Sequence, residues 1–171
     1  MIERKYDEAL NALHTLPVDS IFNQFFFRPR TLYYAEIYRE KNNLELARLY
    51  YDSAQIYLEN KISNIENDHR YHSALGMSYA GLGLEEEAVR EAQAAVNLMP
   101  VKKDYLRGIF CLEDLARTYI MVGDLGNASE TLNQLLSMPS LISLKLLKKD
   151  PFWSPLWEYP GFIQMTELYD K

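Results

Sequence analysis

The chain reads Leu75-Gly76-Met77-Ser78-Tyr79-Ala80-Gly81-Leu82-Gly83-Leu84-Glu85-Glu86-Glu87-Ala88 at its middle, and the same pattern continues through Ala92, Ala95, Leu98 and Pro100. Two other segments share this spacing of small and aromatic residues, and the first segment shares only its second half. The small anchor recurs at spacings of 38, 41 and 40 residues, at Ala9, Ala47, Ala88 and Ala128. The aromatic anchor recurs at spacings of 41 and 40 residues, at Tyr38, Tyr79 and Tyr119. Such an internal repeat indicates one supersecondary unit that is stacked several times along the chain.

Each unit is predicted to be a pair of antiparallel helices. A small residue three positions before the tyrosine lets two helix axes approach closely, and the tyrosine fills the gap beside them. Gly83 and Gly123 can adopt the positive φ that ends the first helix of a pair, and Asn42 stands at the equivalent place. We expect helices over about residues 2–16, 29–41, 44–60, 69–81, 84–97, 103–121, 125–137, 140–149 and 161–169. We expect no strands, and a hydrophobic connector over 17–28.

The pattern resembles the tetratricopeptide repeat. The residues that carry the resemblance are Leu75, Gly76, Tyr79, Gly83, Ala88, Ala92, Ala95 and Pro100. The resemblance implies an all-α fold, an α-solenoid in which helix pairs stack into a right-handed superhelix around a concave groove. We divide a single domain, 1–171, into a truncated repeat (1–27), three repeats (28–67, 68–107 and 108–139) and a C-terminal capping segment (140–171).

Both ends of the chain carry expectations of their own. The sequence begins within a repeat, with the second helix of a pair and no first helix before it. Such a helix would expose Ile2, Tyr6, Leu10 and Leu13, so we expect either a fragment of a longer protein or a partner that covers this face. Near the other end, residues 149–162 hold prolines and aromatic residues that do not suit a helix interior. We expect this stretch to cap the last repeat, with a ligand-binding aromatic patch as the alternative.

The closing stretch also resembles the last segment of repeat arrays that end many large bacterial signalling proteins. The matching residues are Asp150, Pro151, Trp153, Pro155, Leu156, Pro160 and Phe162. In that family the arrays follow cyclase domains, protein kinase domains, or winged-helix domains with TolB-like parts. The resemblance implies that this chain is the C-terminal part of such a regulator, without the activity of those other domains.

Composition excludes several classes of protein. Apolar residues make up 48% and charged residues 25%, which is typical of a globular protein and not of a disordered one. The net charge of −6 argues against a protein that binds nucleic acid through its phosphates. No apolar run has the ~18 residues that a membrane span needs. The single cysteine, Cys111, excludes an intramolecular disulfide and suits the reducing cytoplasm.

Candidate chemistry is sparse. His69 and His72 lie three residues apart on a predicted helix face, next to Glu66 and Asp68, which is a spacing that could bind a metal ion. The packing position of His72 favours a structural role instead, and Cys111 has no obvious catalytic partner in the sequence. We therefore expect no enzyme, no catalytic residues, no cofactor and no metal.

The concave groove is the remaining candidate site. The family's pattern places its lining at Leu32, Glu36, Arg39, Glu40, Ser73, Met77, Ala80, Phe110, Glu113, Arg117 and Ile120. Repeats that bind the carboxylate end of chaperone tails use Lys, Asn and Arg, where this chain has Leu32, Glu36, Ala74, Phe110 and Asp114. The groove is therefore expected to bind a neutral or basic, partly apolar segment of a protein or peptide, and neither nucleic acid nor a membrane.

Three functions stay open at this point. The leading one is a non-enzymatic, cytoplasmic module for protein–protein interaction that binds a peptide or helix in the groove. The second is self-association, as a homodimer formed through the exposed first helix. The third is an enzyme or a small-ligand sensor that uses the tyrosine-rich interior.

Overall fold

The computed structural model describes residues 5–169, and helices take up 72% of these residues. The bounds of the elements are α1 Tyr6–Thr15, β1 Ser20–Phe22, β2 Phe27–Pro29, α2 Arg30–Glu40, α3 Leu44–Ile62, α4 His69–Leu82, α5 Glu85–Leu98, α6 Tyr105–Val122, α7 Leu125–Leu136, α8 Leu144–Leu147, the 3-10 helix η1 Pro151–Leu156 and α9 Pro160–Tyr169. The helix pairs expected over 29–60, 69–97 and 103–137 are therefore present.

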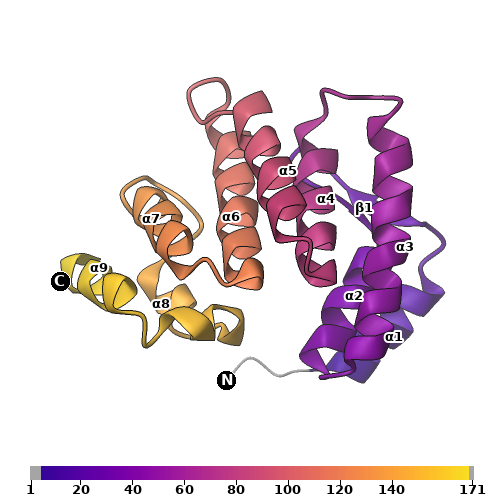
Figure 1. Ribbon diagram of the computed structural model, residues 1–171, viewed down its shortest axis with the longest axis horizontal. Helices are drawn as coiled ribbons and strands as arrows, with labels where there is room; N and C mark the ends of the chain where they lie inside the picture. Colours follow the sequence, from indigo (N-terminus) through magenta and orange to yellow (C-terminus); the bar gives the residue numbers. More distant parts are fainter. Residues whose placement is uncertain (1–4, 170–171) are drawn as a thin grey trace.

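Consecutive helices pack against each other in chain order. Extensive contacts join α2 with α3, α4 with α5, and α6 with α7, and contacts of similar extent, between α3 and α4, α5 and α6, and α4 and α6, join one pair to the next. Figure 1 shows the result as a row of helices that runs from α1–α3 at one end to α9 at the other. α4 lies at the centre of this row, and most of its residues are buried.

The turns within the pairs follow the sequence pattern. Gly83 and Gly123 adopt φ of 79° and 80° and end α4 and α6, and Asn42 adopts φ of 59° between α2 and α3. Asp124 then caps α7, because its side chain accepts a hydrogen bond from the backbone N–H of Asn127. At Gly76 the two helices α4 and α5 lie close together: a Cβ there would lie 3.0 Å from the carbonyl oxygen of Ala88.

Two clusters of buried side chains form the core. The first joins α2, α3 and α4 with the segment before them, and it includes Phe27, Tyr51 and Tyr71. The second joins α6 and α7 with the C-terminal segment, whose Trp153 and Leu156 are fully buried. The prolines and aromatic residues of the closing stretch thus cover the end of the row of helices, where we expect a cap.

The segment expected to be a connector without strands is an antiparallel hairpin. In it β1 pairs with β2, with Ile21 opposite Arg28, and the Asn23 side chain accepts hydrogen bonds from two backbone N–H groups in the turn. Strands of three residues are too short to show an alternating pattern, so hydrophobic periodicity cannot predict them. The ring of Phe27 packs edge-on against Tyr71 and stacks on Tyr57, which holds the hairpin on α3 and α4.

Two further expectations need correction. The short helix expected over 140–149 is confined to α8, and residues 151–156 form the 3-10 helix η1 although they contain two prolines. Proline suits the first position of such a turn, because the N–H that it lacks would have no partner there. Asp150 caps η1 by accepting a hydrogen bond from the backbone N–H of Phe152.

The first helix is paired rather than exposed. α1 packs on α2, where Tyr6 donates a hydrogen bond to Glu40 and Lys41 forms an ion pair with Asp7. Of the face expected to be exposed, Leu13 is buried and Tyr6 and Leu10 are half-buried, whereas Ile2 lies outside the described residues. α2 thus has neighbours on two sides, α1 and α3. No helix in the described part of the chain has the length and apolar character needed to cross a membrane.

Candidate functional site

A pocket of about 620 Å³ opens where α2, α4 and α6 face the same side of the molecule. Three other parts of the chain complete its wall: α1, the hairpin, and the closing segment at Asp150, Pro151 and Phe152. The pocket thus gathers residues from both halves of the chain. Its volume lies within the ~300–1,000 Å³ that is typical of ligand sites.

Most of the predicted groove residues meet in this pocket. Those that line it are Glu36, Arg39, Glu40, Met77, Phe110, Glu113 and Arg117. They come from three helices that are far apart in sequence, so the repeat pattern located the positions that share one side. Met77 is 3% exposed and lies in the lining, where the sequence predicts a soft floor.

The other four predicted residues do not line this pocket. Leu32, Ser73, Ala80 and Ile120 are all buried, and Leu32 has no exposed surface at all. Leu32 and Ala80 belong to the first core cluster, and Ile120 belongs to the second. A repeat pattern gives the side of a helix but not the depth of a side chain, which depends on neighbouring elements.

Sequence reasoning missed the lining residues other than the predicted groove positions. They are Lys5, Tyr6, Ala9, Phe26, Arg28, Tyr33, Asp150, Pro151 and Phe152, together with Asp114 beside a predicted position. Most of them belong to α1, the hairpin and the closing segment, whose docking on the helices no periodicity reveals. Only the aromatic character of the closing stretch pointed to a role in binding.

Arg28 of the hairpin holds two helices of the pocket together. Its guanidinium donates to Glu36 Oε1 of α2 at 2.7 Å and to Asp114 Oδ1 of α6 at 3.0 Å. The three side chains are 16%, 25% and 15% exposed. Burial alone would lower the pKa of Arg28, but the two carboxylates outweigh it and raise the pKa above its ordinary value, so the guanidinium stays charged.

A second group of charges surrounds Phe152. Arg117 donates to Glu113 Oε1 through Nε at 3.2 Å and through Nη2 at 3.0 Å. Arg39 lies 3.6 Å from Glu40. The guanidinium carbons of Arg39 and Arg117 lie 5.3 and 4.9 Å from the centre of the Phe152 ring, within the range of a cation–π contact. The pocket thus combines aromatic surface with charges that already have partners.

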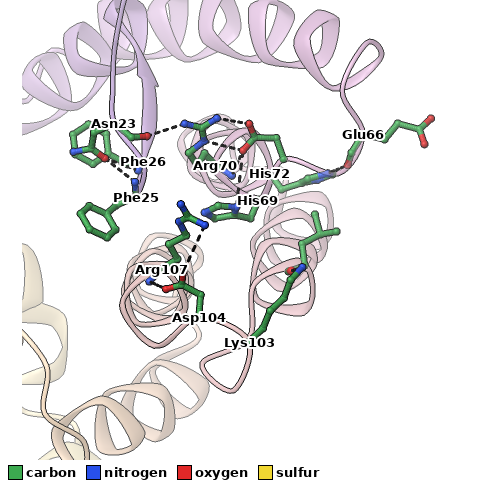
Figure 2. Close-up of polar contacts among 12 residues, drawn as sticks. Asn23, Phe25, Phe26, Glu66, His69, Arg70, His72, Lys103, Asp104 and Arg107 are labelled. Atoms are coloured by element: carbon green, nitrogen blue, oxygen red, sulfur yellow. Dashed lines mark hydrogen bonds and ion pairs between the residues drawn. The ribbon is translucent and has the colours of Figure 1, made fainter.

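The turn of the hairpin covers another part of the predicted groove. Phe25 stacks on Phe110, with ring centres 4.9 Å apart. Arg70 of α4 donates to the backbone carbonyl of Asn23 at 2.8 Å and so fixes the turn, as Figure 2 shows. An extended segment that followed the whole row of helices would therefore meet this turn.

The two histidines that could bind a metal ion contact neighbouring polar groups, and the cysteine thiol is buried. The two ring nitrogens of His72 contact Glu91 and the carbonyl oxygen of Glu66, each at 2.8 Å, and Figure 2 shows the second contact. His69 is buried with Nδ1 4.0 Å from Asp68. Within residues 5–169, no three His, Cys, Asp or Glu side chains are grouped so that they could hold a metal ion. Burial raises the pKa of Cys111 to about 12, which keeps the thiol protonated.

The described lining of the pocket contains no Ser, Thr, Cys or His side chain. What this part of the chain offers a ligand is aromatic surface, the thioether of Met77, and guanidinium and carboxylate groups. Comparison with protein-family models, curated proteins and solved structures finds no match to this chain.

Proposed function

We propose that this chain is a non-enzymatic protein-interaction module that binds a short segment of a protein partner in the pocket. The single observation that carries the proposal is the meeting of seven predicted groove residues, from α2, α4 and α6, in one pocket of about 620 Å³. Paired charges and aromatic surface in a concave site are suited to recognition of a partner segment.

The proposed architecture is an α-solenoid of tetratricopeptide-like repeats. Three features support it: the packing of α2–α3, α4–α5 and α6–α7 in chain order, the positive φ at Asn42, Gly83 and Gly123, and the close approach of α4 and α5 at Gly76. In such an array the first helices of the pairs line the concave side, which is where α2, α4 and α6 meet the pocket.

The pocket favours a short, largely apolar partner segment. The sequence predicts a neutral or basic one because of Glu36 and Glu113, but Arg28 and Arg117 already pair these carboxylates. A basic segment would have to compete with those arginines, so a neutral segment fits better. The hairpin turn over Phe110 limits the free length of the groove, which favours a few residues rather than a long helix.

A small-ligand sensor is the second candidate. It is supported by the volume of the pocket and by walls that come from both ends of the described chain.

Self-association through α1 has less support, because Leu13 is buried and the face around it packs on α2. On the resemblance of the closing segment alone, we also propose that the module belongs to a bacterial signalling protein and works in the cytoplasm.

Selection from a random peptide library tests the interaction function. We expect selected peptides to bind the chain, and Phe110→Ala and Glu113→Lys each to weaken binding at least tenfold by calorimetry. Glu86→Lys on the exposed start of α5 is the control and should leave affinity unchanged. Failure to select any peptide, or equal binding by all variants, would contradict the assignment.

A thermal-shift screen of metabolites tests the sensor function, since a ligand that binds only the folded chain raises its Tm.

A further inference from the structure

One aromatic side chain in the wall of the pocket lies directly against two of the predicted groove residues. Phe152 projects from η1 to the guanidinium groups of Arg39 and Arg117, which lie 5.3 and 4.9 Å from its ring centre. Both arginines are predicted groove residues, and they come from α2 and α6. The ring therefore sits where a partner's side chain is expected to bind.

The two arginines are held in place independently of Phe152. Arg117 is hydrogen-bonded to Glu113 one turn earlier on α6, and Arg39 lies beside Glu40 on α2. Each guanidinium is thus partly neutralised by a carboxylate of its own helix, and the hydrogen bonds to Glu113 also orient that of Arg117. Such a guanidinium can attract the face of an aromatic ring without needing an anion from the ligand.

Phe152 is held less firmly than its neighbour. Trp153 is fully buried in the second core cluster, whereas Phe152 is only half-buried and borders the pocket. The two rings meet edge-on, with centres 5.1 Å apart, and the guanidinium carbon of Arg117 lies 5.1 Å from the centre of the Trp153 ring as well. Trp153 is fixed within the core, whereas Phe152 packs against that core from the wall of the pocket. Trp153 can therefore keep the closing segment in place while the side chain of Phe152 turns away from the arginines.

A second intramolecular contact points to the same ligand chemistry. Phe25 of the hairpin turn stacks on Phe110, another predicted groove residue, at 4.9 Å. Three predicted groove residues, Arg39, Arg117 and Phe110, thus already contact aromatic rings of the closing segment or the hairpin turn. Charged ligands gain less, because Glu36, Glu113, Arg28 and Arg117 are paired with one another.

We propose that the partner segment presents an aromatic side chain to Arg39 and Arg117, and that Phe152 occupies this position in the free protein. The inference rests on the proposed function, and it adds both the chemistry of the ligand and an intramolecular competitor. Binding then includes the exchange of one ring for another. Removing Phe152 should strengthen binding, which is the opposite of what loss of an ordinary contact residue does.

The test uses the chain's own segment as the probe. An acetylated peptide with the sequence of residues 149–152 is titrated into the full chain and into Phe152→Ala, and the Nε–H signals of Arg39 and Arg117 are followed by NMR. We expect the peptide to bind Phe152→Ala at least tenfold more tightly than the unchanged chain. A peptide with Ala in place of Phe should not bind, and Arg117→Ala in the Phe152→Ala background should abolish binding. Ile163→Ala, on the exposed face of α9, is the control and should behave like the unchanged chain.

Several outcomes would overturn the inference. One is equal affinity of the peptide for the unchanged chain and for Phe152→Ala. Another is binding of the peptide that has Ala in place of Phe. A third is an affinity for Phe152→Ala that does not change when Arg117→Ala is added. If the peptide binds neither chain while library-selected peptides still require Phe110, the inference fails and the proposed function stands. Circular dichroism checks that Phe152→Ala folds; if it does not, Phe152→Leu decides, because leucine preserves apolar packing but offers no ring to the arginines.

Discussion

At the scale of single residues, Arg28 is the side chain on which the shape of the pocket depends. We expect Arg28→Met to lower the free energy of unfolding by ~1–3 kcal/mol, because it leaves the carboxylates of Glu36 and Asp114 largely buried without a cation. Urea unfolding measures the effect, and Arg48→Met, at an exposed position of α3, is the matched control. Adding Glu36→Gln and Asp114→Asn to Arg28→Met should restore part of the loss. If Arg28→Met left the free energy of unfolding unchanged, that result would show that the three charges do not stabilise the fold.

His72 gives the protein a stability that depends on pH. Its hydrogen bond to Glu91 outweighs burial and raises the pKa of His72, and the same bond lowers the pKa of Glu91. The stabilisation of the folded state by protonated His72 is therefore complete below its ordinary pKa of about 6.5, and it is lost as pH rises through the raised pKa. The contribution of Glu91 is lost at the acid end, as pH falls through its lowered pKa.

The expected result is a pH dependence of the free energy of unfolding. From pH 6 to pH 8.5, this free energy should fall by up to ~1 kcal/mol more in the unchanged chain than in His72→Gln, which is the size typical of a partly exposed ion pair. Urea titrations at both pH values provide the measurement. His14→Gln on the exposed side of α1 serves as control and should follow the unchanged chain. A loss of the same size in His72→Gln would assign the pH effect to another group.

At the scale of elements, Gly76 determines how closely α4 and α5 pack. Alanine is favoured over glycine in a helix by ~1 kcal/mol, but a Cβ at Gly76 would lie 3.0 Å from the backbone of Ala88 and Ala92. Overpacking of this kind costs ~1–3 kcal/mol, so we expect Gly76→Ala to be destabilising on balance. Gly126→Ala, with nothing closer than 3.5 Å, should be neutral or stabilising. If the melting curves of Gly76→Ala and Gly126→Ala did not differ, that result would contradict this packing argument.

The same elements show what the sequence could and could not predict. The helix pairs and their turns were predictable because spacing, glycine and Asn42 report local backbone geometry and one packed face. The hairpin was not, because three-residue strands carry no periodic signal and Phe27 is buried by the distant Tyr71. In the pocket, seven of the residues that the pattern assigned to the groove on α2, α4 and α6 are present, but Tyr33 and Asp114 of these helices were not assigned to it. The pattern could not locate Arg28 or Phe152, whose positions depend on contacts between segments more than 80 residues apart in sequence.

At the scale of the whole molecule, the two core clusters imply two regions of different stability. Stacked helix pairs contact only their neighbours, so a change at one end should weaken that end first. Ending the chain after Lys149 removes Trp153, Leu156 and Phe162 from the cluster of α6 and α7, but it leaves the cluster of α2–α4 intact. We expect hydrogen exchange to become faster in α6 and α7 while α3 and α4 keep their protection. A chain that ends after Tyr169 is the matched control. Uniform loss of protection along the truncated chain would show instead that both clusters unfold as one cooperative unit.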